Sequence, residues 1–431
     1  MSQHQFDLAV FGQVTRDVLS TSSFRAKRLG GISYAASTAK QLGLQTCAIG
    51  IVANSDLNLA DRILKRRGLC AELSGFDGLP ITYSIHGADE ITDQVVERTG
   101  GIPSEKDWNY VHQNLRSAKY VLIYPVSNSN YDLVAERYKA DGTIVAIDLQ
   151  HDIRSYKEIL DVFQFVDIIF TNRDAILSLT ESRELSESII RVREHYKGIL
   201  IVKMGLAGSY AIDSNNQCYH IPAFLSDFQV TVGAGDAFNS GVIASLMSNA
   251  SLCDAVTHGA RVASIVIEKL ELDPSKDLAN SLTLPRSSVG IRPTEPAPLI
   301  YVAGHFHSSP LRFMLEGIAA ALEKAGFRTF LPHRDVGVVN SHGVTAETAF
   351  KSDLEGLRAS SGVVALLDGA NRGGTYFELG YADALNIPLI VLSTDNTLGI
   401  SNMILQSAKH IGSDLRLVLN QCMMLCGNYQ A

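Results

Sequence analysis

The sequence lacks the cysteine patterns that mark metal sites and disulfide frameworks. Its 431 residues include six cysteines, none of them in a C-x-x-C or Cys/His ligand spacing. Cys422 and Cys426 lie four residues apart in an apolar stretch, so we interpret them as packing residues. His305, His307 and His333 have no carboxylate spaced to complete a site, and we therefore predict no metal held by protein ligands.

Long apolar runs and basic clusters are also absent. No apolar run reaches the ~18 residues that span a bilayer, and the N-terminal stretch contains the strand-like LAVFG instead of a charged leader and an apolar core. The formal net charge is −8, from 37 Lys and Arg against 45 Asp and Glu, with no Lys/Arg run longer than three residues. We therefore predict a soluble cytoplasmic protein that binds neither membranes nor nucleic acid. Small anions stay possible ligands, because local loops bind them whatever the net charge.

What the sequence does contain is an alternation of strand-like and helical patterns. The length alone predicts two or three domains. Between residue 6 and about residue 270 the strand-like runs are FDLAVFG, TCAIGIV, YVLIYPV, TIVAIDL, VDIIFT and GILIVKMG. Helical patterns separate them, which predicts βαβ units around a mostly parallel sheet. Residues 74–101 instead alternate apolar and polar side chains, as a small β lid over one face of the sheet would.

A composition change divides the chain. Residues 273–297 are rich in proline and have little periodicity, so we predict a linker there, between domains at residues 1–272 and 298–431. After it the alternation restarts with LIYVAG, FRTFLP, VVALLDG and IPLIVLS among its strands. Both domains are therefore predicted to be α/β, and the second to be a doubly wound, flavodoxin-like domain with five strands.

The first candidate site is the segment GAGDAF, which opens a predicted helix. Consecutive small residues, Gly233, Ala234 and Gly235, let backbone N–H groups converge on an anion at a helix N-terminus. Asp236 is placed among them to accept a proton from a hydroxyl that attacks phosphorus. Taken alone the segment fits a tight turn at least as well.

Other segments accompany this one: GQVTRDV with Asp17, then GGISYAASTAKQLG, TNRDAILSL and KMGLAGS. In order and spacing, residues 5–270 resemble the ribokinase-like (phosphofructokinase B) family of sugar and nucleoside kinases. The resemblance implies ATP with Mg²⁺ as cofactors, Asp236 as catalytic base and residues 233–235 as anion hole. It also implies that Asp17, Gly30 and Gly31 bind sugar hydroxyls and that Asn172 lies near the Mg–ATP phosphates.

Some positions depart from that family. Val230–Thr231 stands where the family usually has Asp–Thr, which puts a monovalent-cation site in doubt, and Ala35 stands where an Asn is frequent. Asp174 replaces a customary Glu. These departures leave a second hypothesis open, in which a degenerate kinase-like domain only binds a nucleotide.

The second candidate site is Glu378, in the segment GGTYFELGYA after the strand-like VVALLD. The pattern predicts that Glu378 lies in the first turn of a helix, beyond the carboxyl end of a parallel strand, where open α/β sheets bind ligands. A carboxylate there is ordinarily a favourable contact with the helix dipole, worth ~0.3–1 kcal/mol. On this fact alone a structural role is the better interpretation.

Further segments change that interpretation: YVAGHF, LPHRD, FKSDLEGL and SNMI also fall at predicted strand rims or helices. With GTxxELGYA they resemble the nucleoside 2-deoxyribosyltransferase family and its related 2′-deoxynucleotide N-hydrolases, over about residues 298–415. The resemblance implies that Glu378 attacks the anomeric carbon of a deoxyribosyl group and expels the base. It implies that Tyr301 orients the carboxylate, Asp353 touches the sugar or base, and Gly374 contacts the substrate. Asn402 would come from a neighbouring subunit, so the resemblance implies a homo-oligomer.

Arg372 departs from the transferases, which usually carry an Asp six residues before the nucleophile. A guanidinium is a strong phosphate ligand, so Arg372 favours a 5′-phosphorylated substrate. A solvated loop arginine is the alternative.

Two sites in one chain predict a bifunctional enzyme of nucleoside or nucleotide metabolism. It would phosphorylate a nucleoside or sugar with ATP, and it would cleave or exchange an N-glycosidic bond. Phosphorylation before cleavage is the order that Arg372 favours, and cleavage followed by phosphorylation of free deoxyribose is the alternative. In the second hypothesis a nucleotide-sensing kinase-like domain gates the C-terminal N-glycosidase.

Overall fold

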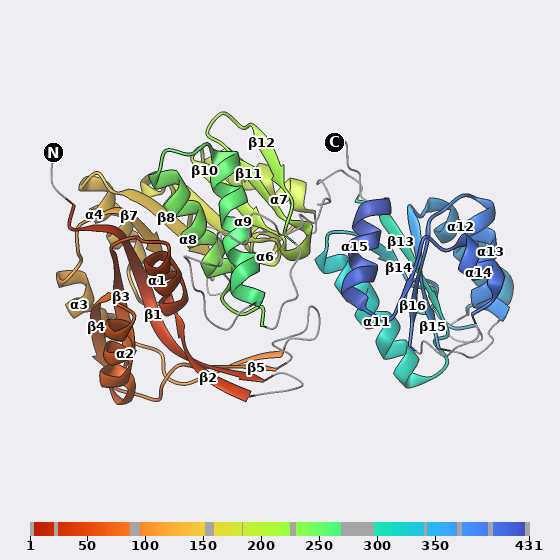
Figure 1. The fold of residues 1–431 in the computed structure, drawn as a ribbon, viewed down its shortest axis with the longest axis horizontal. Coiled ribbons are helices and arrows are strands. Elements are labelled where there is room, and N and C mark those ends of the chain that lie inside the picture. Colours follow the sequence, from red (N-terminus) through yellow and green to blue (C-terminus); the bar gives the residue numbers. More distant parts are fainter. Residues whose placement is uncertain are drawn as a thin grey trace. The chain divides into compact units, whose positions relative to one another are not determined.

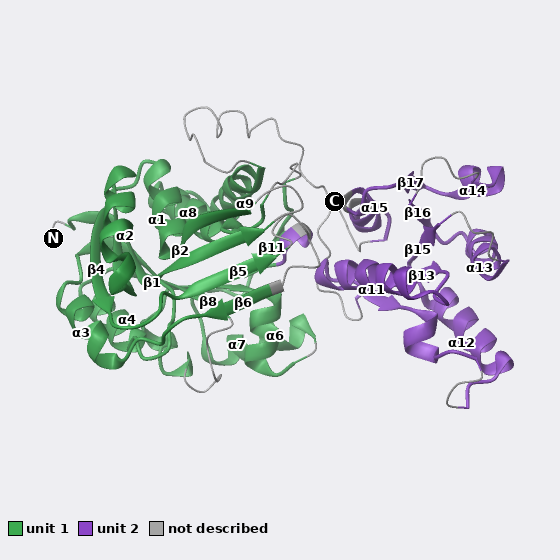
Figure 2. Ribbon diagram, turned by 90° about the horizontal axis from the view of Figure 1, so that it is seen from below, with its two compact units in different colours: residues 1–203, 208–286 green, residues 204–207, 287–431 purple. Residues whose placement is uncertain are grey.

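The computed structural model describes residues 4–20, 25–86, 95–150, 159–182, 184–224, 230–268, 297–339, 343–368, 373–394 and 400–426. The chain divides into two compact units (Figures 1 and 2), each of which is described by itself. Unit 1 comprises residues 1–203 and 208–286, and unit 2 comprises residues 204–207 and 287–431. Most of the predicted linker, and Arg372, lie outside the described residues. No helix of the described residues is long and apolar enough to cross a membrane.

Unit 1 is built on a large, mostly parallel sheet. Its neighbouring strands are, in order, β12 (Cys218–Ile221), β11 (Ser209–Ile212), β10 (Ile199–Lys203), β9 (Ile168–Asn172), β8 (Ile144–Leu149), β7 (Ala118–Ile123), β1 (Phe6–Ser20), β3 (Thr46–Ala53) and β4 (Cys70–Phe76). From β10 to β4 every pair is parallel, and β11 and β12 add an antiparallel edge. The predicted mostly parallel sheet is therefore confirmed.

The predicted β lid is also present. The C-terminal part of β1 leaves the main sheet and pairs with β2 (Arg25–Gly31) and β5 (Thr82–His86), and β5 pairs with β6 (Val95–Thr99). Leu19, Ile85 and Val230 form a small buried cluster beneath these strands. Strand β1 therefore belongs to both the main sheet and the lid.

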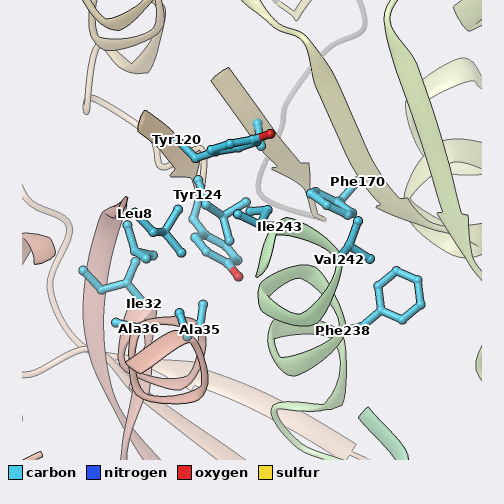
Figure 3. Close-up of a cluster of buried hydrophobic side chains, with 14 of the residues drawn as sticks. Leu8, Ile32, Ala35, Ala36, Tyr120, Tyr124, Phe170, Phe238, Val242 and Ile243 are labelled. Atoms are coloured by element: carbon cyan, nitrogen blue, oxygen red, sulfur yellow. The ribbon is translucent and has the colours of Figure 1, made fainter. Parts of the chain in front are cut away.

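Helices cover both faces of the main sheet (Figure 2). One face carries α1 (Ile32–Gln41), α2 (Asn54–Arg66), α8 (Ala234–Met247) and α9 (Leu252–Glu268). The other carries α3 (Glu105–Gln113), α4 (Tyr131–Ala140), α6 (Arg173–Thr180) and α7 (Leu185–His195). The core under α1 and α8 joins side chains from both helices with strand residues, and the buried ring of Tyr124 lies among them (Figure 3).

Helices α8 and α9 are in close contact at two glycines, Gly241 and Gly259. A Cβ on Gly241 would lie 2.9 Å from the Cα of Gly259, and a Cβ on Gly259 would lie 2.7 Å from the carbonyl oxygen of Phe238. The two backbones therefore pack closer than any larger residue at these positions would permit.

Unit 2 has a five-stranded, fully parallel sheet. Its order is β14 (Arg328–Phe330), β13 (Leu299–Gly304), β15 (Gly362–Leu367), β16 (Leu389–Ser393) and β17 (His410–Gly412). In chain order this is 2-1-3-4-5, the flavodoxin-like doubly wound order, as predicted. One face is covered by α11 (Ser309–Lys324) and α15 (Leu415–Cys426), and the other by α12 (Ala346–Ala359), α13 (Gly373–Ala384) and α14 (Asn402–Ser407) (Figure 1).

Candidate active sites

In unit 1 the structure brings two of the predicted residues into one pocket. A cavity of about 210 Å³ is lined by both Asp17, from β1, and Asp236, from the first turn of α8. Tyr83 and Ile85 of the lid strand β5 also line it. β1 and the first turn of α8 therefore each supply a carboxylate to a space suited to a small molecule.

Asp17 is held by hydroxyl groups. The Thr15 Oγ1 donates to its Oδ1 at 2.9 Å, and the Tyr34 hydroxyl donates to its Oδ2 at 2.8 Å. Burial raises the pKa of Asp17, and the two hydroxyl donors partly offset that rise. A Cβ on Gly30 would overlap this carboxylate, and Gly31, with φ +60°, begins the turn into α1. The glycine pair therefore lets the lid strand β2 close on Asp17.

The GAGD segment forms the predicted helix start. Gly233 has φ +90° and caps α8, whose first residues are Ala234, Gly235 and Asp236. The N–H groups of a helix's first turn have no partner within the helix, so they are available to an anion. Burial is the main cause that raises the pKa of Asp236 to about 7, while the Tyr124 hydroxyl lowers it. A carboxyl with this pKa is suited to a general base near neutral pH.

Asn172, which was predicted to lie near the Mg–ATP phosphates, has a structural role in the fold. It ends β9, and its Oδ1 accepts a hydrogen bond of 2.7 Å from the backbone N–H of Ala175 as the N-cap of α6. It pairs in register with Lys203 of β10, so both lie at the same end of the sheet. Asp174 is exposed in the first turn of α6.

Three residues of unit 1 that sequence reasoning missed form one buried network. Asp148, Lys203 and Asn239 come from β8, β10 and α8, more than thirty residues apart in sequence, and hydrogen-bond to one another. The available signal was a lysine at the end of the buried run GILIV, where an unpaired charge would be costly.

In unit 2 the structure brings Tyr301, Asp353 and Glu378 together. The Tyr301 hydroxyl, from β13, donates a hydrogen bond of 2.8 Å to Glu378 Oε1 in α13. Tyr301 is fully buried and stacks on Phe330 at 5.3 Å between ring centroids, so its ring is fixed by packing. This geometry holds the Glu378 carboxylate in one orientation.

The pKa values of both carboxyl groups of this site, those of Glu378 and Asp353, are raised above their ordinary values. Burial raises the pKa of Glu378 to about 7, with the Tyr301 hydrogen bond lowering it and the nearby Asp353 charge raising it further. Burial alone raises the pKa of Asp353, in α12, to about 6. The Asp353 Oδ1 is buried and has no hydrogen-bond partner among the described residues, although buried polar atoms normally have one. That oxygen is a candidate ligand contact.

The position of Glu378 in its helix differs from the prediction. Helix α13 begins at Gly373 and has no acidic residue in its first turn, so Glu378 lies in the second turn. The favourable effect of a helix dipole falls off within the first turn. The simple helix-dipole interpretation of Glu378 therefore loses its support, and a half-buried carboxylate with a raised pKa needs another explanation.

The remaining predicted residues of unit 2 lie at its surface or outside the described part. Gly374 is exposed in the first turn of α13, and Asn402 is exposed at the first position of α14. Arg372 immediately precedes α13 but is not among the described residues. In those residues no group of three or more His, Cys, Asp or Glu side chains is arranged to hold a metal ion.

Two parts of the chain match the models of known protein families. Residues 96–277 match the family model of pfkB family carbohydrate kinases, and residues 300–418 match that of nucleoside 2-deoxyribosyltransferases. Both predicted family resemblances are confirmed. Unit 1 is called the kinase-like unit below, and unit 2 the transferase-like unit.

Curated relatives match the kinase-like unit. A 5-dehydro-2-deoxygluconokinase of Listeria monocytogenes is 23% identical over 301 residues, which cover 62% of this chain and 92% of that protein. The enzyme of that name from Lacticaseibacillus casei is 28% identical over 124 residues, and the match spans only 38% of its length and 28% of this chain.

Solved structures show the same fold. A probable sugar kinase of Rhizobium etli superposes with a TM-score of 0.54 at 20% identity, covering 65% of this chain and 100% of that one. The adenosine kinase of Sinorhizobium meliloti gives 0.55 at 18% identity, covering 64% and 99%. At these identities the likeness establishes the ribokinase-like fold of the kinase-like unit.

Proposed function

We propose that the transferase-like unit cleaves or exchanges the N-glycosidic bond of a 2′-deoxynucleoside or its 5′-phosphate, with Glu378 as nucleophile. The observation that supports this most is the hydrogen bond from the buried Tyr301 hydroxyl to a carboxylate whose pKa is raised to about 7. A fixed, poorly solvated carboxylate is suited to attack an oxocarbenium-like carbon. The matched family is the second support.

In the proposed reaction Glu378 Oε attacks the anomeric carbon while the carbon–nitrogen bond to the base breaks. The electron pair of that bond stays on the base nitrogen, which takes a proton from the protonated Asp353. Water or a second base then attacks the glycosyl ester and releases Glu378, and Asp353 recovers its proton from the attacking group. Asp353 suits this role because its pKa of about 6 leaves part of it protonated near neutral pH.

These two ionisations predict a bell-shaped pH profile for kcat/KM of base release. Activity should rise as Glu378 ionises at about pH 7 and fall as Asp353 ionises at about pH 6, which gives an optimum between these values. Because the acid has the lower pKa, only a minority of the molecules has both groups in the required state at the optimum. The pair titrates as a coupled unit.

A substrate whose base already carries a positive charge provides the control for the role of Asp353 as proton donor. Asp353→Asn should slow base release from deoxyadenosine 5′-monophosphate by about 100-fold or more. It should leave 7-methyl-2′-deoxyguanosine nearly unaffected, since that base departs without needing a proton. Equal losses on both substrates would assign Asp353 to substrate binding instead.

Arg372 supports a phosphorylated substrate by its residue type and its position before α13. A charge-assisted contact is worth roughly 1.5–3 kcal/mol, or about 10- to 150-fold in discrimination. The whole protein should therefore cleave deoxynucleoside 5′-monophosphates better than deoxynucleosides, with base release followed by chromatography. Arg372→Ala should raise KM for the monophosphate and barely change KM for the nucleoside. Wild-type protein that cleaves both equally well would contradict the phosphate role and favour the nucleoside transferase reaction.

We propose a homo-oligomer formed through the transferase-like unit. Asn402 is exposed, as is its neighbour Met403, whose side chain is 80% exposed. Phe350 of α12 and Phe377 of α13 are also exposed, with ring centroids 6.1 Å apart. An exposed apolar group of this kind is typical of an association surface.

Mixing two inactive variants tests whether Asn402 acts in a neighbouring subunit. Asn402→Ala and Glu378→Gln should each be inactive, yet mixed oligomers should recover up to about a quarter of the wild-type activity, because some sites combine an intact Glu378 with an intact Asn402. Met403→Glu should shift the protein towards monomer in light scattering, whereas Leu417→Glu, the same change at an exposed leucine of α15, should not. A mixture that stays inactive would place Asn402 within its own subunit's site.

For the kinase-like unit we propose ATP-dependent phosphorylation of a nucleoside or sugar, with Asp236 as base. The pocket that joins Asp17 and Asp236 supports it, as do the named activities of the curated relatives. The helix start fits the phosphates of ATP, because Gly233, Ala234 and Gly235 expose N–H groups without bulky side chains. Mg²⁺, which commonly binds through substrate phosphates, would enter with them. When bound, ATP supplies the phosphoryl group.

Two observations favour opposite orders of the two reactions. The curated relatives are named for a 2-deoxy sugar acid, which supports phosphorylation of a sugar after cleavage, whereas Arg372 favours phosphorylation first. In the alternative function the kinase-like unit is a nucleotide sensor. The apolar, buried Val230 and Ala35, at positions where the family usually has polar residues, favour that alternative.

A further inference from the structure

Lys203 is a partly buried cation at the carboxyl end of β10. Its Nζ lies 3.0 Å and 3.2 Å from the two carboxylate oxygens of Asp148 and 3.1 Å from Asn239 Oδ1. Only 15% of the lysine side chain and 1% of the Asp148 side chain is exposed. The Asn239 Nδ2 completes the network by donating to Asp148 Oδ2 at 2.8 Å.

This network lies directly against residues 233–235 at the start of α8, which are called the anion-binding loop from here on. A Cβ on Gly235 would lie 3.4 Å from Lys203 Nζ, so the ammonium reaches the backbone of the residue that precedes Asp236. Asn239 is one helical turn after Asp236 on α8. The lysine and asparagine therefore connect two strands of the sheet to the first two turns of α8.

The charges around Asp236 show why a cation is needed here. The groups that act on its ionisation from the packed elements are Asp17, Tyr34, Tyr124, Asp148 and Lys203. The two aspartates raise the pKa of Asp236, and Lys203 is the cation among these groups and lowers it. An incoming phosphate would add further negative charge at the same place, where burial strengthens every electrostatic interaction.

We propose that Lys203, fixed by Asp148 and Asn239, is a positioning residue of the kinase-like unit: it holds the anion-binding loop and supplies the positive charge behind it for the transferring phosphoryl group. The proposal rests on the kinase function proposed above. It adds a residue and a charge source that neither the GAGD segment nor Mg–ATP provides.

A purely structural ion pair is the competing explanation, and a double variant separates the two. Lys203→Met alone leaves Asp148 buried without its cation, which is strongly destabilising whatever Lys203 does. Lys203→Met/Asp148→Asn removes both charges together. The matched control is Lys119→Met/Asp7→Asn, which removes the ion pair of 2.8 Å between the second residue of β7 and the second residue of β1.

The first measurement is ATP affinity by titration calorimetry, with MgATP and with pyrophosphate as probes. We expect the Lys203→Met/Asp148→Asn variant to bind both at least about tenfold more weakly than wild type and the control variant to bind them equally well. The single variant Lys203→Arg, which keeps the positive charge, should retain most of the wild-type affinity for both probes. If the double variant binds both probes as tightly as wild type while its thermal unfolding is normal, the proposal is overturned.

The second measurement is the pH profile of phosphoryl transfer. With Lys203→Met the acid limb, which reports ionisation of Asp236, should move to higher pH. In the double variant the limb should return towards that of wild type, because Asp148 acts in the opposite direction, yet kcat should stay at least about tenfold low. A double variant with wild-type kcat would show that Lys203 serves only Asp148. If wild-type protein transfers no phosphoryl group, the proposed kinase function fails, and the affinity measurement still decides the role of Lys203.

Discussion

Replacing Glu378 with glutamine should reduce base release by at least roughly a thousandfold, because an amide cannot form the glycosyl ester. The amide oxygen can still accept the Tyr301 hydrogen bond, so the shape of the site is kept. The measurement is the rate of base release from deoxynucleosides and their 5′-monophosphates, together with mass spectrometry of wild-type protein for a trapped glycosyl adduct. A glutamine variant with more than a tenth of wild-type activity would contradict the nucleophile assignment.

The stability of the same variant separates lost chemistry from lost folding. Burial raises the folded-state pKa of Glu378 to about 7, above its ordinary value, so the protonated form favours the folded state. The stability that this provides is present at low pH and is lost as the pH rises through 7. Glu378→Gln should therefore unfold at a higher temperature than wild type at about pH 8, while the two differ little at about pH 5.

Asp236→Asn should reduce phosphoryl transfer by about a hundredfold to ten-thousandfold, the usual contribution of a general base. ATP should still bind, because the loop offers backbone N–H groups that the substitution does not remove. Coupled measurement of ATP consumption and calorimetry of ATP binding will show the two effects separately. Asp254→Asn, at an exposed position in the first turn of α9, is the matched control and should leave the rate of transfer nearly unchanged.

The sensor hypothesis makes a different prediction for the same experiment. Wild-type protein would then bind ATP but phosphorylate no nucleoside or pentose, and Asp236→Asn would change nothing measurable in ATP turnover. ATP would instead alter the rate of base release in the transferase-like unit. That result would exclude the kinase function and retain the glycosidase.

Local sequence patterns predicted the elements of both units because each strand is a nearly continuous apolar run. VVALLD became β15, with residues Gly362–Leu367 all buried, and LIYVAG became β13. A run buried on both faces is typical of a parallel strand. That Tyr301 lies beside Glu378 was implied by the resemblance to the transferase family and not by the strand patterns, and the hydrogen bond between the two side chains agrees with it.

The exact start of α13 was harder to predict. Two glycines and a threonine precede Glu378, and such residues are poor helix formers, so the sequence favoured a later start. In the structure the helix nevertheless begins at Gly373, and the buried side chains of Leu379 and Ala382 pack it against the sheet. Packing of these residues outweighs the weak local propensity.

The network of Lys203 could not be predicted because its partners are distant in sequence. Asp148 and Asn239 are 55 and 36 residues from the lysine, and their contact depends on sheet register and on where α8 crosses the strands. Tyr34 and Tyr124 entered the pocket of unit 1 for the same reason. Motifs identify residues that act through local backbone, whereas charge compensation is a property of the assembled sheet.

The glycine contact between α8 and α9 bears on how this enzyme could be engineered. At most helical positions an alanine in place of glycine adds about 1 kcal/mol of stability, and a consensus-based stabilisation would choose it at Gly259. Here the added methyl group would press on the Phe238 carbonyl, two residues from Asp236, and force α8 and α9 apart near the first turns of α8. Thermostabilised libraries of this protein should therefore exclude Gly241 and Gly259, because a gain in helix propensity there would be offset by misplacement of the GAGD segment at the start of α8.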